Sequence, residues 1–441
     1  MKDDVCVFWF RRDLRLEDNA GLYHALKSGY KVLPIFVFDE TILKKLVNKN
    51  DRRVDFIHQS VQYLNKQLNQ LGSSIKTYYG YPAEVLTNLF TEFNIKAVYV
   101  NNDYEPAAIK RDQEIAGLLK SQNISFMSFK DQCIFEKNEV LKDDGKPYTV
   151  FTPYNKKWKQ KFTEFFARPY PCRKYFENFY KFNNYNIPTL TEIGFNTTDI
   201  EFSIPKIDQE LIRNYKEQRD FPAIKGTSRI SMHLRFGTIS IRHACNIAVN
   251  TNETWLNELI WRDFYMMILF HFPHVECSAF KKEFNYLEWS NDEKAFSKWC
   301  NGETGFPIVD AGMRELNATG FMHNRVRMIT ASFLIKDLLI DYTWGEAYFA
   351  EKLNDFDLSA NNGGWQWAAG CGCDAAPYFR IFNPTQQQKK FDPEFEYIKK
   401  WIPEFGTDAY PKPIVDHAIA RHKALKTYKK SLSENKQLSL L

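Results

Sequence analysis

Several patterns that would assign this 441-residue chain to a common class are missing from its sequence. Its eight cysteines form no C-x-x-C pair and no zinc spacing, so we expect reduced thiols and no metal site. The longest apolar run, Phe264–Phe270, is too short to cross a bilayer, and the first one, Cys6–Phe10, does not resemble a secretory leader. P-loop, HExxH and Ser-His-Asp patterns are also missing. We therefore expect a soluble, cytoplasmic protein whose chemistry, if it is an enzyme, resides in a cofactor.

A strong excess of one charge is missing too. The formal net charge of +5 is too small to indicate a nucleic-acid partner by itself. Basic residues gather in the segments Lys156–Lys161 and Tyr215–His243, and either group fits a solvated face as well as a binding surface. Aromatic residues, in contrast, reach 16% of the chain. Core packing is their usual role, and stacking or electron transfer are the functional alternatives.

The first 130 residues alternate apolar strands with helical patterns. We expect strands at Val5–Phe10, Val32–Phe38, Ile75–Tyr79 and Ala97–Val100, and helices at Asn19–Gly29, Val54–Leu71 and Ala83–Phe93. This βαβ rhythm predicts a Rossmann-like parallel sheet covered on both faces. Because no G-x-G-x-x-G is present, this domain need not bind the main cofactor.

The rest of the chain reads as a connector followed by helices. Prolines and aromatics are frequent from Phe151 to Pro205, which favours a long ordered connector over disorder. Later segments have helical spacing: Leu256–Phe270, Ile308–Thr319, Asn324–Asp341 and Trp344–Leu353. The fold class expected is thus α/β plus all-α. We place an α/β domain at 1–130, a connector at 131–204, a helical domain at 205–425 and a short basic tail at 426–441.

One segment places a carboxylate, a guanidinium and two aromatic rings on the same helical face. The residues spaced at i, i+3, i+4 and i+7 are Glu258, Trp261, Arg262 and Tyr265. Such a face suits a pocket that stacks a planar base and hydrogen-bonds its edge. An ordinary Glu–Arg helix pair beside core aromatics is the simpler local explanation.

Three further segments combine features of a binding site. Gly226–Ser231 offers backbone N–H groups, hydroxyls and an arginine to a phosphate, although a helix cap is the ordinary explanation. Asn354–Trp367 combines carboxylates, amides and tryptophans with two glycines that permit close ligand approach. In the segment His323–Met328, Arg327 could pair with Asp355 beside a redox ring or lie on the surface.

Taken together and in this order, these segments resemble the photolyase/cryptochrome family. The resemblance extends from Val5 to about Trp401. The matching motifs are Trp9–Asn19, Gly226–Ser231, Trp261–Tyr265, Gly305–Asp310 and Asn361–Trp367. It implies an N-terminal α/β domain, a connector and a helical domain that holds one FAD, active in its reduced form.

The resemblance also implies residues for the cofactor. Positions that hold the FAD phosphates and ribitol correspond to Tyr215, Thr227, Ser228, Arg229, Ile230 and Ser231. Positions around the flavin rings correspond to Trp255, Asn324, Arg327, Asp355, Phe356, Asp357 and Asn361. Asn361 falls where the family places a group facing the flavin N5. There an amide can tune radical stability, because it donates without adding charge.

Within the family, the resemblance is to class I cyclobutane pyrimidine dimer photolyases. The residue types that carry this assignment are Glu258, Trp261, Asn324, Met328 and Trp367. A (6-4) photolyase would carry a histidine pair where this chain has His323-Asn324. The implied function is light-driven repair of pyrimidine dimers in DNA by electron transfer, and the protein is expected to act as a monomer. The alternative is a blue-light-sensing cryptochrome without repair activity.

The resemblance implies catalytic roles for Glu258, Trp261, Met328, Asn361 and Trp367. It implies DNA contacts for Glu258, Trp261, Arg262, Asn324 and Trp367, with phosphate contacts from Arg219, Arg325, Arg380 and Gln387. The lesion must flip out of the duplex to reach such a cavity. Trp261 and Trp367 would then form a hydrophobic wall against its bases.

Two departures from the family pattern concern electron and energy transfer. Trp365 and Trp289 match the first and last tryptophans of the family's relay, but the middle position is Tyr342, with Trp344 two residues on. A tyrosine radical must usually lose its proton, so photoreduction can be slower or rerouted. A folate-binding member would carry Asn-Glu soon after Tyr104-Glu105, where this chain has Ala107-Ala108. A methenylfolate antenna is therefore doubtful, and a deazaflavin, a second flavin or no antenna remain as alternatives.

Overall fold

The structure is a computed structural model that describes residues 2–182 and 185–435. The chain forms two compact units, each built from separate stretches. The sheet unit comprises 1–136, 160–207 and 229–250, and the helical unit comprises 137–159, 208–228 and 251–441. The domain limits expected at 130, 204 and 425 stay predictions, and residues 436–441 of the expected tail lie outside the described residues.

The sheet unit contains the predicted parallel sheet. Five strands lie in the order β3-β2-β1-β4-β5, and all four neighbouring pairs are parallel. The strands are β1 (Asp4–Phe10), β2 (Lys31–Asp39), β3 (Lys76–Gly80), β4 (Asn94–Asn101) and β5 (Ser125–Phe129). The sequence pattern missed β5, because this edge strand is partly exposed and lacks a buried apolar run.

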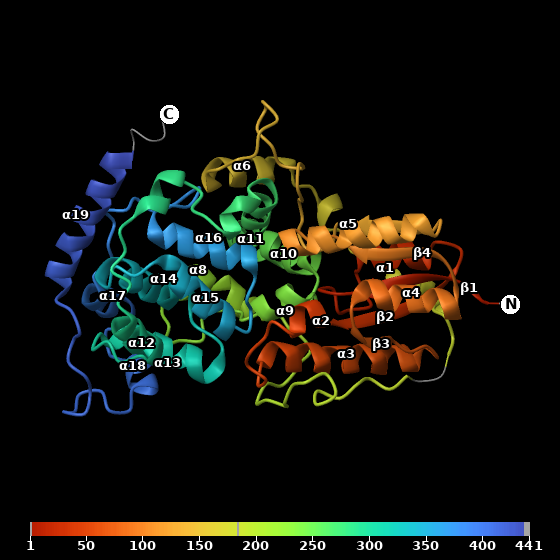
Figure 1. Cartoon of the computed structure of the whole chain (residues 1–441), viewed down its shortest axis with the longest axis horizontal. Helices are drawn as coiled ribbons and strands as arrows, with labels where there is room; N and C mark the ends of the chain where they lie inside the picture. Colours follow the sequence, from red (N-terminus) through yellow and green to blue (C-terminus); the bar gives the residue numbers. More distant parts are fainter. Residues whose placement is uncertain (1, 183–184, 436–441) are drawn as a thin grey trace. The chain divides into compact units, whose positions relative to one another are not determined.

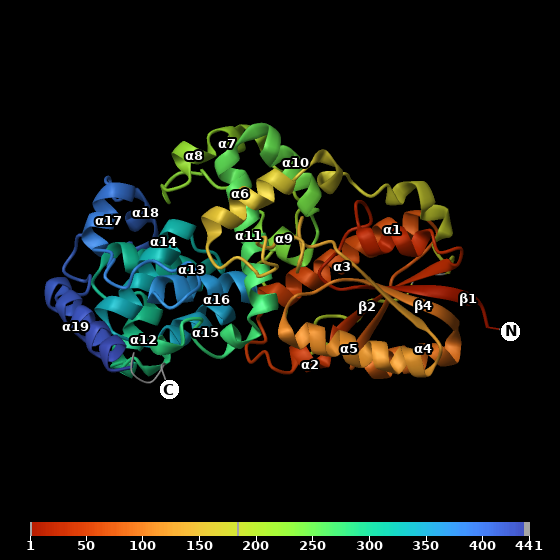
Figure 2. The ribbon, with the colours of Figure 1, turned by 90° about the horizontal axis from the view of Figure 1, so that it is seen from above.

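The sheet is covered on both faces, which explains the continuous apolar run in β1. Cys6, Phe8 and Phe10 share one hydrophobic cluster with α1 (Ala20–Leu26) and α3 (Arg52–Gln70). Alternate residues of β1 share the other cluster with α4 (Pro82–Glu92) and α5 (Pro106–Ser121). In Figure 2, α1 and α3 lie above the strands, and α4 and α5 lie below them. A strand buried on both faces has no polar side to alternate with.

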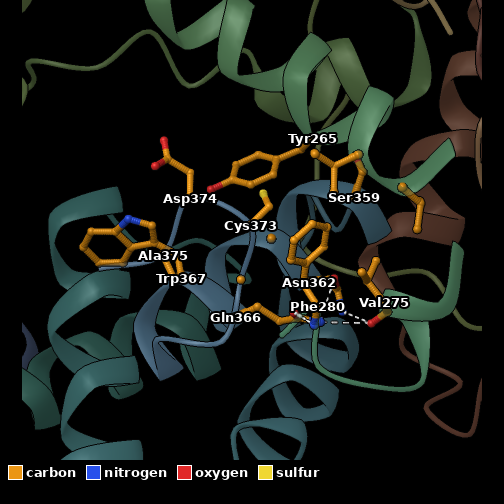
Figure 3. Close-up of a pocket in the computed structure, with 14 residues that line it drawn as sticks. Tyr265, Val275, Phe280, Ser359, Asn362, Gln366, Trp367, Cys373, Asp374 and Ala375 are labelled. Carbon is orange, nitrogen blue, oxygen red and sulfur yellow. Dashed lines mark hydrogen bonds between the residues drawn. The ribbon is translucent and has the colours of Figure 1, made fainter. Parts of the chain in front are cut away.

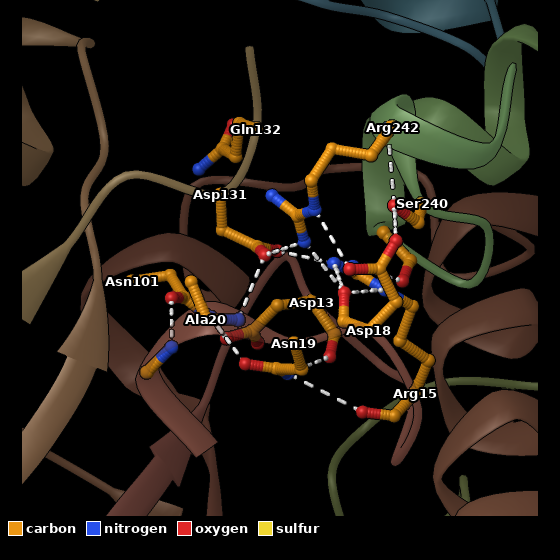
Figure 4. Close-up of polar contacts among 12 residues, drawn as sticks. Asp13, Arg15, Asp18, Asn19, Ala20, Asn101, Asp131, Gln132, Ser240 and Arg242 are labelled. Atoms are coloured by element: carbon orange, nitrogen blue, oxygen red, sulfur yellow. Dashed lines mark hydrogen bonds and ion pairs between the residues drawn. The ribbon is translucent and has the colours of Figure 1, made fainter. Parts of the chain in front are cut away.

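Side chains of the protein itself occupy the point where the strand order reverses, beyond the carboxyl ends of β1 and β4 (Figure 4). Open α/β sheets usually bind ligands there. Here Arg242, at the start of α10 (Ile241–Thr251), donates to Asp18 and to Asp131, each at 2.7 Å. Arg15 donates to the second oxygen of Asp131 at 2.6 Å. Burial opposes ionisation of Asp131, but Arg15 and Arg242 outweigh it and lower its pKa.

The helical unit confirms the helical pattern after Ile207 (Figure 1). Three predicted helices appear as α11 (Glu253–His271), α13 (Pro307–Thr319) and α15 (Tyr342–Lys352). The helix expected over Asn324–Asp341 is shorter, because α14 (Asn324–Ser332) continues into a π turn at Phe333–Asp337. The left-handed backbone at Leu339, with φ of 52°, then prevents a further helical turn.

The remaining helices complete the two units. The connector is more regular at its start than expected, because α6 (Phe151–Lys161) buries Tyr154 and Trp158 at helical spacing. Beyond α6 it contains two short 3-10 turns at Glu164–Ala167 and Cys172–Asn178. No helix within the described residues is long and apolar enough to cross a membrane. The other helices are α2 (Glu40–Leu43), α7 (Gln209–Arg213), α8 (Tyr215–Gln218), α9 (Ser231–Phe236), α12 (Glu293–Asn301), α16 (Leu358–Ala369), α17 (Pro384–Phe391), α18 (Glu396–Trp401) and α19 (His417–Asn435), with 3-10 turns at Pro273–Glu276 and Lys282–Tyr286.

Candidate functional site

Most of the predicted site residues lie on three helices of the helical unit that pack together. Helix α16 contacts both α11 and α14. Close packing of α11 and α16 depends on Gly363, because a Cβ atom there would lie 2.2 Å from the Tyr265 ring. Helix α11 carries Glu258 and Trp261, α14 carries Met328, and α16 carries Asn361 and Trp367. The residue types singled out in three separate segments thus belong to one packed group of helices.

An aromatic-walled pocket lies between α11, α16 and the segment after α16 (Figure 3). Trp367 and Tyr265 line it. Gln366 and Asn362 lie on one side, where both amides donate to the Val275 backbone carbonyl, at 3.1 Å and 2.8 Å. Cys373 and Asp374 also line the pocket and were missed, because nothing in their local sequence pattern distinguishes them from an ordinary loop.

Trp261 is positioned differently from Trp367. It lies outside the set of residues that line this pocket. Its ring packs face to face with Phe151 of α6, with ring centroids 3.6 Å apart and 6° between the planes. On α11 it also contacts Tyr265, at a centroid distance of 5.3 Å. The wall expected from Trp261 and Trp367 stays a prediction, and the rings that Trp261 contacts here are those of Phe151 and Tyr265.

Asn361 and its neighbour both contact Glu346 of α15. The Asn361 amide donates to the Glu346 backbone carbonyl at 3.1 Å. The Asn362 amide donates to the Glu346 side chain, also at 3.1 Å. Burial raises the pKa of Glu346 to about 7, against the hydrogen bond from Asn362. The Asn361 nitrogen thus uses one of its two N–H donors on this carbonyl, which leaves a second N–H and the amide oxygen to face a ligand.

The ion pair expected between Arg327 and Asp355 is confirmed. Both carboxylate oxygens accept from Arg327 Nη2, at 3.0 Å and 3.2 Å. Arg327 Nε also donates to the Met322 backbone carbonyl at 2.8 Å, which fixes the plane of the guanidinium. Nearby, Asp357 caps α16 by accepting from the Ala360 N–H, at 3.3 Å.

The predicted lesion contact Glu258 and the predicted phosphate contact Arg219 bind each other. The Arg219 Nη1 donates to Glu258 Oε1, and its guanidinium carbon lies 5.3 Å from the centre of the Tyr215 ring. Burial raises the pKa of Glu258, although Arg219 opposes the shift. The other phosphate candidates are separate: Arg380 is exposed, Gln387 is partly buried on α17, and Arg325 pairs with Asp220 at 2.8 Å.

The division of the chain into two units falls within the segment predicted to bind phosphate. Thr227 and Ser228 belong to the helical unit, and Arg229–Ser231 belong to the sheet unit. Gly226 is required locally, because a Cβ atom there would lie 2.7 Å from Gln218 Cβ. A helix, α9, does begin at Ser231, but its N-cap is Ile230 and no side chain caps it. The ordinary explanation of a Ser/Thr cap is therefore wrong.

The remaining candidates differ in burial. Trp255 of α11 is 3% exposed, Arg262 and Phe356 are partly buried, and Asn324 is exposed at the first turn of α14. The relay candidates Trp365 and Tyr342 are buried, whereas Trp289 and Trp344 are partly buried. The structure thus places every relay residue in the helical unit.

The predicted relay residues have different aromatic neighbours. The ring centroid of Trp365 lies 6.2 Å from that of Trp299, a buried tryptophan that sequence reasoning missed. The centroid distance is 5.8 Å from Trp299 to Phe296 and 5.2 Å from Phe296 to Trp344. The ring contacts between Trp365 and Trp344 are therefore continuous.

Two family models match this chain. Residues 6–173 match the family model described as DNA photolyase, and residues 255–408 match the FAD binding domain of DNA photolyase. A deoxyribodipyrimidine photo-lyase from Alkalihalophilus pseudofirmus is 38% identical, covering 97% of this chain and 98% of that protein.

Two solved structures extend the comparison to the fold. A class III photolyase from Agrobacterium tumefaciens has a TM-score of 0.87 and 31% identity, with 98% of each chain covered. A photolyase from Sulfolobus tokodaii, solved with two FAD molecules, has a TM-score of 0.84 and 33% identity over 97% of this chain and all of that one.

Proposed function

The chain belongs to the DNA photolyase family, and from this premise we propose that it repairs cyclobutane pyrimidine dimers in DNA with light. The observation that carries the proposal is the packing of α11, α14 and α16, which gathers Glu258, Met328 and Trp367 in one unit. These are the residue types that favour dimer repair over (6-4) repair. Curated relatives matched over nearly the whole chain carry the photo-lyase name, so the cryptochrome alternative is not favoured.

The donor set of the helical unit fits FAD. Asn361 presents an amide, and Arg327 and Asp355 present a fixed ion pair, which suits the polar edge of a flavin ring. Tyr215, Thr227 and Ser228, followed by Arg229–Ser231, would hold the phosphates and ribitol. Reduced FAD held there would supply the light-driven electron for opening the cyclobutane ring and would receive it back, so repair would consume no reductant.

The protein's own task is then to hold the flipped lesion. Base–aromatic stacking is worth roughly 1–3 kcal/mol per base, which can offset the few kcal/mol needed to unstack a damaged pair. Trp261 and Trp367 supply aromatic surface for this stacking, and Asn324 and Met328 are proposed beside it. Glu258 is proposed to hydrogen-bond the thymine edge. Burial raises its pKa, and Arg219, which donates to Glu258 Oε1, opposes this shift.

Basic and polar side chains of the helical unit are proposed to contact the DNA backbone: Arg219, Arg325, Arg380 and Gln387. Arg262 is proposed as a further DNA contact. Such contacts release counterions from DNA, so affinity should fall as salt rises. The cytoplasmic location and the monomeric state expected from the sequence remain predictions.

The residues at the start of α5 bear on the antenna pigment. Ala107 and Ala108 lie in the first turn of α5, where a folate-binding member would carry Asn-Glu. The Sulfolobus tokodaii relative was solved with two FAD molecules. A second flavin or a deazaflavin is therefore the pigment proposed here, if any is bound. Pigment extraction with mass analysis distinguishes the two, and recovery of a folate would contradict the proposal.

A repair assay tests the function directly. Purified protein with verified, reduced FAD is mixed with an oligonucleotide that contains one thymine dimer and is exposed to blue light. We expect dimers to disappear under light and to persist in the dark. Dimers that stay unchanged in the light, with reduced FAD present throughout, would reject the enzyme and revive the light-sensing alternative.

A further inference from the structure

Asp220 lies between two arginines that are proposed to bind DNA phosphates. Its Oδ1 is 2.8 Å from Arg325 Nη2 and 3.8 Å from Arg219 Nε. Arg219 is also paired, through Nη1, with Glu258. Four charged side chains of alternating sign thus follow one another, and we call them the charge chain: Glu258, Arg219, Asp220 and Arg325. Two carboxylates balance two guanidinium groups, so the formal charge of the charge chain is zero.

The charge chain is accessible, not buried. Its side chains are between 19% and 37% exposed, with Asp220 the most exposed of the four. Ion pairs with this exposure contribute only a modest free energy, and an incoming anion can exchange with one partner. Guanidinium groups bind carboxylates and phosphates with the same fork of N–H donors. A phosphate oxygen can therefore replace the Asp220 carboxylate on either arginine.

Arg325 is held at the proposed lesion site by other contacts as well. Its guanidinium carbon lies 4.5 Å from the centre of the Phe391 ring, and Nη1 lies 3.8 Å from Met328 Sδ. These contacts keep Arg325 beside Met328 whether or not its ion pair with Asp220 is formed. Loss of Asp220 would therefore free the charge of Arg325 without moving its side chain far.

We propose that Asp220 occupies the place of a DNA phosphate in the free protein and competes with the DNA backbone for Arg219 and Arg325. The proposal rests on the proposed function for the identity of the DNA partner. Damaged and undamaged DNA must both displace Asp220 before their phosphates contact these arginines, so the cost of displacement is common to both. Only DNA with a flipped dimer gains stacking energy as well, which helps to offset this cost. Asp220 thereby lowers the affinity for all duplex DNA, and the lesion contacts alone distinguish the damaged duplex.

The test is the binding of the Asp220→Asn holoprotein to two duplexes of the same sequence, with and without one thymine dimer, in the dark. We expect Kd for undamaged duplex to fall about two- to tenfold, because up to two weak ion pairs no longer compete. We expect a similar change for the damaged duplex, because both duplexes displace Asp220, so the ratio of the two Kd values stays the same. We also expect log K to fall more steeply with log salt, by about one, because displaced Asp220 no longer recruits a cation.

Matched variants separate charge from position. Glu404→Gln also removes one carboxylate paired with an arginine, at 2.6 Å from Arg314 in the same unit, and should leave both Kd values unchanged. Asp220→Glu keeps the charge and should behave as wild type. In an Arg325→Gln background, Asp220→Asn should have a smaller effect than in wild type, because one of its two partners is already gone.

The outcomes distinguish this inference from the function on which it rests. Unchanged Kd values and salt dependence for Asp220→Asn, or weaker binding to both duplexes, would overturn the inference, since Asp220 would then be neutral or a support for the arginines. Wild-type protein that binds both duplexes equally would instead overturn the lesion preference. The salt dependence on undamaged duplex still measures the role of Asp220 in that case.

Discussion

Phe151 lies flat against Trp261, with 3.6 Å between the ring centroids and 6° between the planes. Aromatic pairs usually prefer offset or edge-to-face geometry, so a face-to-face pair needs support from its surroundings. Asp374, which lines the neighbouring pocket, accepts the Phe151 backbone N–H at 2.9 Å. The ring of Phe264 packs edge-on against Phe151 at 5.8 Å. One face of Trp261 is thus covered by the protein, and a stacked base must use other indole surface.

Phe151→Ala should therefore weaken binding of dimer-containing DNA. Loss of the ring pair removes about 0.5–1.5 kcal/mol, which corresponds to a two- to tenfold higher Kd. The dissociation constant for a dimer-containing duplex measures this effect in the dark. Phe165→Ala, which removes a phenylalanine that is 72% exposed, serves as the control and should change nothing. An unaltered Kd for Phe151→Ala would show that Phe151 does not support binding, and a lower Kd would show that it blocks Trp261.

Glu258→Ala should lower the number of dimers repaired per absorbed photon while FAD remains bound. The variant loses a hydrogen bond to the thymine edge, with a net worth of about 0.5–1.5 kcal/mol, so we expect a two- to tenfold decrease. Repair yield and flavin absorbance are measured on the same sample. Glu253→Ala on the same helix removes a carboxylate that is 76% exposed and pairs with Lys159, and it should repair normally. Loss of flavin from Glu258→Ala would assign Glu258 to cofactor binding instead.

Trp344→Phe and Trp299→Phe should both slow photoreduction of the bound flavin. The rings from Trp365 through Trp299 and Phe296 to Trp344 are in contact, with centroid distances between 5.2 and 6.2 Å. Burial raises the pKa of Tyr342, so its oxidation is hindered by a proton that is hard to lose. Tyr342→Phe should therefore leave the rate unchanged. The rate is followed by flavin absorbance under blue light with excess reductant.

The control for the photoreduction experiment is Trp401→Phe. Trp401 belongs to the same unit but lies outside this series of rings. A slower rate in Tyr342→Phe but not in Trp344→Phe would restore the tyrosine as the middle relay residue. Equal rates in all four variants would place the route elsewhere.

The sheet and its helices could be predicted because their signals are local. Six successive residues of β1, from Val5 to Phe10, are buried, and the printed sequence shows this as an apolar run. The edge strand β5 gives no such run, since a half-exposed strand need not be apolar. The helix after Asn324 is shorter than its sequence pattern predicts. Helical spacing of apolar residues continues towards Asp341, but the left-handed backbone at Leu339 prevents a further helical turn.

The site residues were found through motifs, whereas their partners depend on tertiary contacts. Arg242 stood in a basic cluster that fits a solvated face, yet it is 4% exposed and neutralised by Asp18 and Asp131. Phe151 and Asp220 lie far in sequence from Trp261 and Arg325, so no spacing rule connects them. Burial and pairing of charges arise from the packing of distant segments, and a single sequence does not record them.

Lys336 gives a prediction for stability that does not depend on the proposed function. It is 1% exposed, its Nζ lies 3.6 Å from the centre of the Tyr428 ring, and it donates to the Ala369 carbonyl at 3.1 Å. Burial lowers the pKa of this amine to about 7, from 10.5 in an exposed lysine. Between these values the unfolded chain binds more protons than the folded one, so the free energy of unfolding rises with pH, by at most about 1.4 kcal/mol per pH unit.

Lys336→Met removes this dependence, because methionine fills similar space without titrating, and Tyr428 still donates to the Ala369 carbonyl at 3.0 Å. The variant should unfold at a higher temperature than wild type at pH 6, where the buried amine carries its charge. The advantage should shrink as pH rises from 7 towards 10. Thermal unfolding midpoints measured across this range test the prediction, with Lys430→Met as a control at a lysine that is 52% exposed. A difference between wild type and Lys336→Met that stays constant with pH would mean that the amine keeps its ordinary pKa, stabilised as a cation by the Tyr428 ring.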